Sequence, residues 1–67
     1  MEHVSLLLDR RYIVVSDYEP SANDELKLRQ GDTVVLDLLF SDGWAKGKNE
    51  NSAMEGILPV ACIKVLE

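Results

Sequence analysis

Three carboxylates and one tryptophan are the residues of this sequence whose types suit recognition chemistry. Asp24 and Glu25 stand together in a polar stretch, and Asp42 lies two residues before Trp44, the single tryptophan of the chain. A lone tryptophan at a strand start is usually core, but one beside an Asp-Gly turn is more often half exposed as a ligand platform. An indole face attracts cations, and carboxylates pair with guanidinium groups. This set therefore predicts a site for a positively charged side chain.

The same residues do not predict catalysis, a cofactor or a metal centre. A general acid or base needs a desolvated carboxyl in a cleft, whereas these carboxylates stand in predicted loops. The sequence also offers no nucleophile–base set and no Gly-rich phosphate cradle. His3 and Cys62 are the only histidine and the only cysteine, so no internal disulfide can form and no metal site is expected. We expect a protein without enzymatic activity and without a cofactor.

Length and charge limit the class of partner. The chain has 67 residues, with 12 acidic and 7 basic side chains and a formal net charge of −5. A single small domain of this size buries about 60% of its unfolded surface. The acidic balance disfavours nucleic acid and anionic membranes as partners, and favours a basic one. An acidic surface that only keeps the domain soluble would give the same charge. Apolar runs such as Leu6-Leu7-Leu8 are too short for direct membrane insertion.

Short β-strands joined by turns must position these residues. Alternating and β-branched stretches predict strands at 11–15, 33–38, 44–48, 55–58 and 63–66, with a strand-like loop arm at 26–28. On the strand at 33–38, Val34, Leu36 and Leu38 should share one face. Residues 60–62 can form only a 3-10 turn. Frequent turns without a helical period predict a small all-β barrel.

The predicted domain covers residues 11–67, and residues 1–10 are interpreted as an N-terminal tail. Two alternatives stay open for the tail, namely a disordered or non-native addition and a segment that lies against the domain. The core is predicted to consist of Val14, Leu26, Leu28, Val34, Leu36, Leu58 and Ile63. Gly47 is expected where two strands approach closely.

Four sequence blocks in a fixed order resemble the Src-homology-3 (SH3) family. Residues 14–18 stand where that family has Ala-Leu-Tyr-Asp-Tyr, 24–28 match its acidic loop with Leu-x-Phe, 42–47 match Asp-Gly-Trp-Trp-x-Gly, and 56–63 match its Gly-x-x-Pro-Ser-Asn-Tyr-Val ending. The turn Gly31-Asp32 also fits the family. The resemblance covers about residues 12–66. It implies a small five-stranded SH3-like barrel with a long RT-type loop and one short 3-10 turn.

The departures from the family pattern fall in the groove that binds proline-rich peptides. The resemblance assigns the groove to Ser16, Tyr18, Trp44, Ile57, Pro59 and Cys62. Only Tyr18 and Trp44 remain of the aromatic row, because a serine and a cysteine replace two tyrosines. Cys62 is expected to act as a small apolar groove residue, not as a reactive thiol. Each missing ring or hydrogen bond costs about 1 kcal/mol, so PxxP binding should be weakened at least about tenfold.

The resemblance further implies that the loops carrying Asp24, Glu25 and Asp42 converge beside Trp44 and determine specificity. A ligand arginine would stack on the indole and pair with Glu25 or Asp24. The alternative for these carboxylates is a solvated acidic loop. The Pro-x-x-Cys-Ile ending and the Gly-Trp-Ala-Lys-Gly strand are similar to the atypical SH3 domain of the fungal cell-fusion protein of the mating pathway. Ligands of such domains depend more on arginine and serine than on proline.

We therefore expect a non-catalytic, monomeric interaction module that binds short Arg-containing peptides, Ser- or Pro-rich, through a degenerate PxxP groove. It would belong to a signalling or scaffold protein in the cytoplasm, with a place at the cell cortex. The alternative is a structural SH3 module that has lost peptide binding. Its degenerate face would then pack on a neighbouring domain or on a copy of itself.

Overall fold

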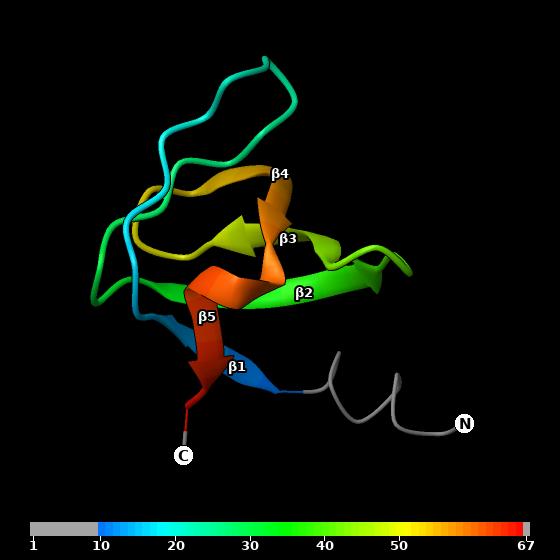
Figure 1. Cartoon of the computed structure of the whole chain (residues 1–67). Helices are drawn as coiled ribbons and strands as arrows, with labels where there is room; N and C mark the ends of the chain where they lie inside the picture. The colour runs from blue at the N-terminus through cyan, green and yellow to red at the C-terminus, as the bar shows by residue number, and fades with distance from the viewer. Residues whose placement is uncertain (1–9, 67) are drawn as a thin grey trace.

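Five antiparallel strands in one sheet make up the computed structural model, which describes residues 10–66 (Figure 1). The strands are β1 (Arg11–Val14), β2 (Thr33–Leu39), β3 (Trp44–Asn49), β4 (Met54–Pro59) and β5 (Ile63–Val65), and the 3-10 helix η1 (Val60–Cys62) joins the last two. The five-stranded all-β fold with one 3-10 turn predicted from the sequence is confirmed, with every strand end within one residue of its expected place. No helix in this part of the chain is long and apolar enough to cross a lipid bilayer. Residues 1–9 of the predicted tail lie outside the described residues.

The strand order β4-β3-β2-β1-β5 leaves β4 and β5 at the two edges of the sheet. The long loop between β1 and β2 rises above the sheet in Figure 1 and covers part of the β4 edge. Its two arms are joined at Tyr18 and Leu28 by reciprocal backbone hydrogen bonds of 2.9 and 3.1 Å. One arm also bonds β4, because Ile57 N–H donates to Asp24 O and Leu26 N–H donates to Ile57 O, both at 2.8 Å. The acidic residues of this loop are therefore held against the sheet.

The core contains all seven hydrophobic residues predicted from the sequence. The buried hydrophobic side chains are Tyr12, Val14, Leu26, Leu28, Val34, Leu36, Ala45, Leu58 and Ile63. The sequence interpretation missed Tyr12 and Ala45, both of which alternate with less buried neighbours on their strands. Gly47 is the place where β3 approaches β2 closely, because a Cβ there would overlap the carbonyl oxygen of Val35. Burial of these side chains supplies the main stabilising free energy of the domain.

The prediction that Leu38 shares the inward face of Val34 and Leu36 is wrong. The register of β2 against β3 shifts between Leu36, which pairs with Gly47, and Leu38, which pairs with Lys46. Two residues of β2 thus oppose one step of β3, as in a β-bulge. Leu36 is 5% exposed and Leu38 is 48% exposed, while Leu39 packs against the core. A one-residue slip in register reverses which side chains face the core. Beyond the bulge, Leu39 therefore faces the core and Leu38 faces solvent.

Candidate functional site

Trp44 opens β3 directly after a tight turn. Gly43 adopts a positive φ of 92°, a conformation that glycine reaches without steric cost. The carbonyl of Gly43 accepts a hydrogen bond from Val60 N–H, and the carbonyl of Trp44 accepts one from Phe40 N–H, both at 2.9 Å. Along β3, Ala45 is buried, whereas Trp44 is only half-buried. The indole therefore belongs to the outer surface, opposite Pro59 in the β3–β4 register.

Tyr18 connects the indole of Trp44 to the carboxylate of Glu25. The rings of Tyr18 and Trp44 meet edge to face, with centroids 6.1 Å apart and an interplanar angle of 77°. This arrangement suits the opposite charges of a ring face and a ring edge. The Tyr18 hydroxyl donates to Oε1 of Glu25 at 2.8 Å. This bond is the main reason why the pKa of Tyr18 is raised above its ordinary value. Ring and carboxylate are thus positioned together.

Glu25 is held by donors from its own loop. Besides the tyrosine hydroxyl, Oε1 accepts the backbone N–H of Ser21 at 2.7 Å and the Ser21 hydroxyl at 3.2 Å. The bond from the Ser21 N–H is the largest of the causes that lower the pKa of the Glu25 carboxyl below its usual value. Hydrogen bonds to the charged form favour that form. Glu25 therefore stays ionised at neutral pH in a fixed position, a role that the sequence interpretation did not assign to it.

The loops on either side of Trp44 enclose an open pocket of about 530 Å³, which we call the Trp44 pocket. Its lining residues are Asp24, Glu25, Phe40, Ser41, Asp42, Trp44 and Ile57. Three of these side chains are acidic, and within the described residues none of the lining side chains is basic. Clefts lined by one sign of charge concentrate the opposite sign. The pocket thus offers an aromatic wall and a negative rim.

The structure brings together five of the nine predicted site residues in the Trp44 pocket, which are Asp24, Glu25, Asp42, Trp44 and Ile57. Tyr18 flanks the pocket through its ring contact with Trp44. Pro59 lies opposite the tryptophan on β4. Ser16 is exposed and Cys62 is half-buried against the core, and the carbonyl of Cys62 accepts the Ser16 N–H at 3.3 Å. Ser16 and Cys62 are therefore neighbours outside the Trp44 pocket.

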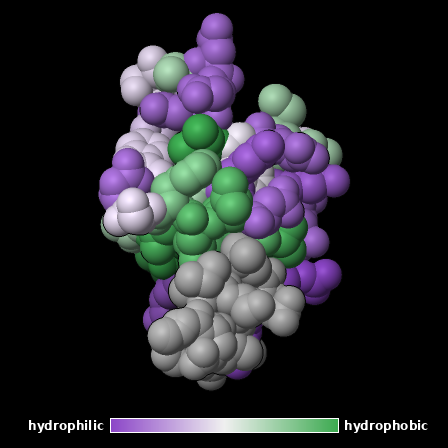
Figure 2. Space-filling model, turned by 90° about the vertical axis from the view of Figure 1, so that its right-hand side faces the viewer, coloured by the Kyte–Doolittle hydropathy of each residue, from purple (hydrophilic) through white to green (hydrophobic). Residues whose placement is uncertain are grey.

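Phe40 and Ser41 line the pocket although the sequence interpretation did not single them out. The bulge in β2 explains the position of Phe40, because it sends Leu39 inward and leaves the flanking Leu38 and Phe40 exposed, at 48% and 40%. The one signal in the sequence that could have identified Phe40 is that an aromatic residue stands two positions before Asp42. Figure 2 shows the side on which the β2–β3 loop lies in Figure 1, with hydrophobic residues at its centre and hydrophilic ones above and beside them. The pocket itself combines apolar contact area from Phe40 and Ile57 with three acidic side chains.

The family is shown by a match to the Variant SH3 domain over residues 14–64. Because this match covers most of the chain, the protein belongs to the SH3 family. SH3 domains are protein-interaction modules, not enzymes. Among the described residues, no group of three His, Cys, Asp or Glu side chains is arranged to hold a metal ion.

Yeast proteins are among the relatives of this chain. It is 26% identical over 61 residues to NAP1-binding protein 2 of Saccharomyces cerevisiae, a match that covers 91% of this chain and 26% of that protein. The chain thus spans about a quarter of the length of this curated relative. The solved SH3 domain of yeast NBP2 is 28% identical, with a TM-score of 0.78 over 87% of this chain and 98% of the other. The finer resemblance to the fungal cell-fusion protein stays a prediction.

Similar SH3 domains have been solved with short peptides. The yeast Nbp2p SH3 domain in complex with a peptide from Ste20p is 28% identical, with a TM-score of 0.77 over 87% of each chain. The C-terminal SH3 domain of myosin IB from Entamoeba histolytica, bound to a peptide named EhFP10(GEF), shares the fold at 22% identity. Its TM-score is 0.76 over 87% of this chain and 93% of that one. Short peptides are therefore ligands within this group of domains.

Proposed function

We propose that this SH3 domain binds a short Arg-containing peptide and receives an arginine in the Trp44 pocket. One observation carries the proposal, namely that the half-buried indole lines an open pocket together with Asp24, Glu25 and Asp42. A guanidinium group stacks on an aromatic face and forms paired hydrogen bonds with a carboxylate. Lysine provides a compact charge without the planar fork, so arginine is the better fit to a flat indole beside carboxylates.

The contributions expected from this pocket are individually modest. A cation over an exposed aromatic ring contributes about 0.5–1 kcal/mol, and an exposed ion pair contributes about 0–1 kcal/mol. The fixed position of Glu25 favours binding, because a preorganised carboxylate loses little freedom when a ligand arrives. Apolar contact with Phe40 and Ile57 adds to these terms. We expect affinities in the micromolar range, as for other small and transient interfaces.

Proline should contribute less to this ligand than to an ordinary PxxP peptide. Tyr18 and Pro59 provide ring surface for one apolar slot beside Trp44. Small side chains stand at Ser16 and Cys62, where the family pattern has tyrosines, and the two residues are neighbours through the Ser16 N–H bond to the Cys62 carbonyl. Polyproline helices depend on aromatic-lined slots. A Ser-rich peptide that carries an arginine therefore suits this face better than a peptide that needs two consecutive proline slots.

A second candidate is a structural SH3 module whose face packs on a neighbouring domain or on another copy of the chain. The observation that favours it is the exposure of Leu38 and Phe40 beside the pocket. Large exposed apolar patches mark interaction surfaces. Light scattering over a range of concentrations separates the two candidates. A mass that rises with concentration supports packing between copies, and a constant monomer mass together with saturable peptide binding supports the first candidate.

The arginine requirement is tested with a matched pair of peptides. We expect a Ser-rich peptide with one arginine to bind at least about tenfold more tightly than the same peptide with glutamine in that place, a difference of about 1.4 kcal/mol. Titration followed by ¹⁵N NMR measures both affinities and reports the Trp44 indole N–H. The difference should shrink at high salt, because exposed charges are screened. Equal affinities for the two peptides would refute the proposal.

A further inference from the structure

A second concavity, of about 370 Å³, lies at the other end of β4 and shares no lining residue with the Trp44 pocket. We call it the Lys27–Arg29 concavity after two of its lining residues. Leu26 and Leu28 are each 1% exposed, so the alternation of the loop arm turns Lys27 and Arg29 outward. Met54, the first residue of β4, also lines it and is 62% exposed. Two cations and one large apolar side chain thus share a surface.

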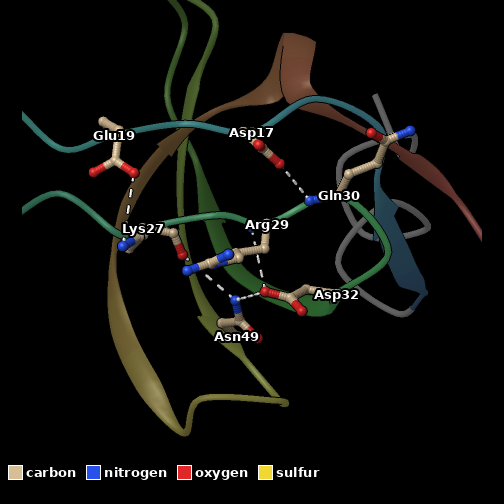
Figure 3. A network of polar contacts seen from close by, with 7 residues as sticks. All are labelled: Asp17, Glu19, Lys27, Arg29, Gln30, Asp32 and Asn49. Carbon is tan, nitrogen blue, oxygen red and sulfur yellow. Dashed lines mark hydrogen bonds and ion pairs between the residues drawn. The ribbon is translucent and has the colours of Figure 1, made fainter.

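The floor of this concavity is fixed by Asn49, which is 1% exposed (Figure 3). Its Nδ2 donates to Oδ2 of Asp32 at 2.7 Å and to the carbonyl of Lys27 at 3.4 Å. Its Oδ1 accepts the backbone N–H of Asn51 at 2.8 Å and that of Ser52 at 3.3 Å. One buried amide therefore ties the loop arm to the β3–β4 turn. A ligand meets a surface that is already ordered, which lowers the entropic cost of binding.

The charge of the concavity is opposite to that of the whole chain. Asp32 is its one carboxylate, and Oδ2 of that residue already accepts bonds from Asn49 and from the Arg29 backbone N–H, the latter at 3.3 Å. Lys27 pairs with Glu19 at 3.6 Å, but both side chains are largely exposed, so the pair contributes little. Among the ion pairs between described residues, none involves the guanidinium of Arg29. The residues that line the concavity thus carry one net positive charge, in a chain whose formal net charge is −5.

We propose that the Lys27–Arg29 concavity binds an acidic peptide segment, which is a second site beyond the proposed arginine pocket. Residues two apart on an extended arm are about 7 Å from each other, and alternate carboxylates of an extended peptide have the same spacing. Arginine takes a carboxylate through two parallel hydrogen bonds. The methylene groups of a bound glutamate would pack on Met54, whose thioether adapts to varied partners. Both charge and spacing therefore fit an extended segment with a carboxylate at every second residue.

A defined probe tests this site, namely the peptide acetyl-Glu-Leu-Glu-Leu-Glu-amide, titrated into the whole chain and followed by ¹⁵N and methyl NMR. We expect saturable shifts at Lys27, Arg29, the Asn49 side-chain amide and the Met54 methyl, without a shift of the Trp44 indole. The double variant K27Q/R29Q should weaken binding at least about tenfold. K48Q/K64Q is the matched control, because it removes two exposed charges from β3 and β5, away from the loop arm. The affinity of this variant for the probe should stay within twofold of the wild type.

The variant E19Q gives a result in the opposite direction. It removes the carboxylate that competes for Lys27, so the probe should bind more tightly by up to a few-fold.

An equal loss of probe affinity in K27Q/R29Q and K48Q/K64Q would show unspecific charge attraction and overturn the proposal. Shifts centred on another surface, or equal shifts from inorganic phosphate at the same concentration, would overturn it as well. The Trp44 pocket shares no lining residue with this site. A failure of acidic-probe binding would therefore leave the proposed arginine site intact, and a failure of arginine-peptide binding would leave the acidic-peptide site intact.

Discussion

Replacing Trp44 with alanine should weaken binding of an Arg-containing peptide at least about 30-fold, which corresponds to about 2 kcal/mol. The indole supplies the wall of the pocket on which the guanidinium stacks, and it also contacts the ring of Tyr18 edge to face. Truncation therefore removes the cation contact and loosens the tyrosine that bonds Glu25. Isothermal titration calorimetry measures the loss.

Two control variants sharpen the Trp44 prediction. Trp44→Phe keeps a ring face of smaller area and should lose only part of the affinity. Met54→Ala removes a large exposed side chain from the far end of β4 and should leave peptide affinity unchanged. Circular dichroism checks that each variant stays folded. If Trp44→Ala binds the peptide as tightly as the wild type, the indole is not the platform.

Replacing Leu36 with alanine should lower the free energy of unfolding by about 2–5 kcal/mol. Leu36 is 5% exposed, and one of its methyl groups lies 3.0 Å from where a Cβ of Gly47 would be, so the site is closely packed. Small domains have total stabilities of about 5–15 kcal/mol, with the shortest chains at the low end. Much of the population should therefore unfold near physiological temperature. Urea denaturation measures the change.

Leu38→Ala is the matched control for this prediction, because it removes the same atoms two residues further along β2. Leu38 is 48% exposed beyond the bulge. Its truncation should cost less than about 1 kcal/mol, since surface substitutions have small effects. Equal losses for the two variants would mean that both side chains face the core, in contradiction to the bulge.

The sequence predicted the strands because their signals are local. Alternation and β-branched residues mark the strands, and Asp42-Gly43 marks the turn before β3. The bulge between Leu36 and Leu38 has no such signal, since Leu38 and Leu39 are chemically equal and either fits the inward face. The shift is decided by how β2 pairs with Lys46 and Ala45 on β3, which is a long-range property of the sheet.

The candidate site was predictable only in part from the sequence. Asp24, Glu25 and Trp44 stand at positions that the family resemblance assigns to the ligand face, and the structure gathers them in one pocket. Phe40 could not be placed, because its orientation depends on the bulge. The bonds from Ser21 and Tyr18 to Glu25 depend on how the long loop folds back on itself. The sequence therefore indicates a binding role for Glu25 but not the hydrogen bonds that hold its carboxylate in place.

Intermolecular nuclear Overhauser effects in the peptide complex are the most direct test of where the arginine lies. The peptide is labelled at its single arginine, and contacts are recorded from the arginine side-chain methylenes to the aromatic protons of the domain. We expect cross-peaks to the indole ring of Trp44, together with a shift of the neighbouring Glu25 amide. Cross-peaks to a different surface, with the indole resonances unmoved at saturation, would contradict an arginine pocket at Trp44.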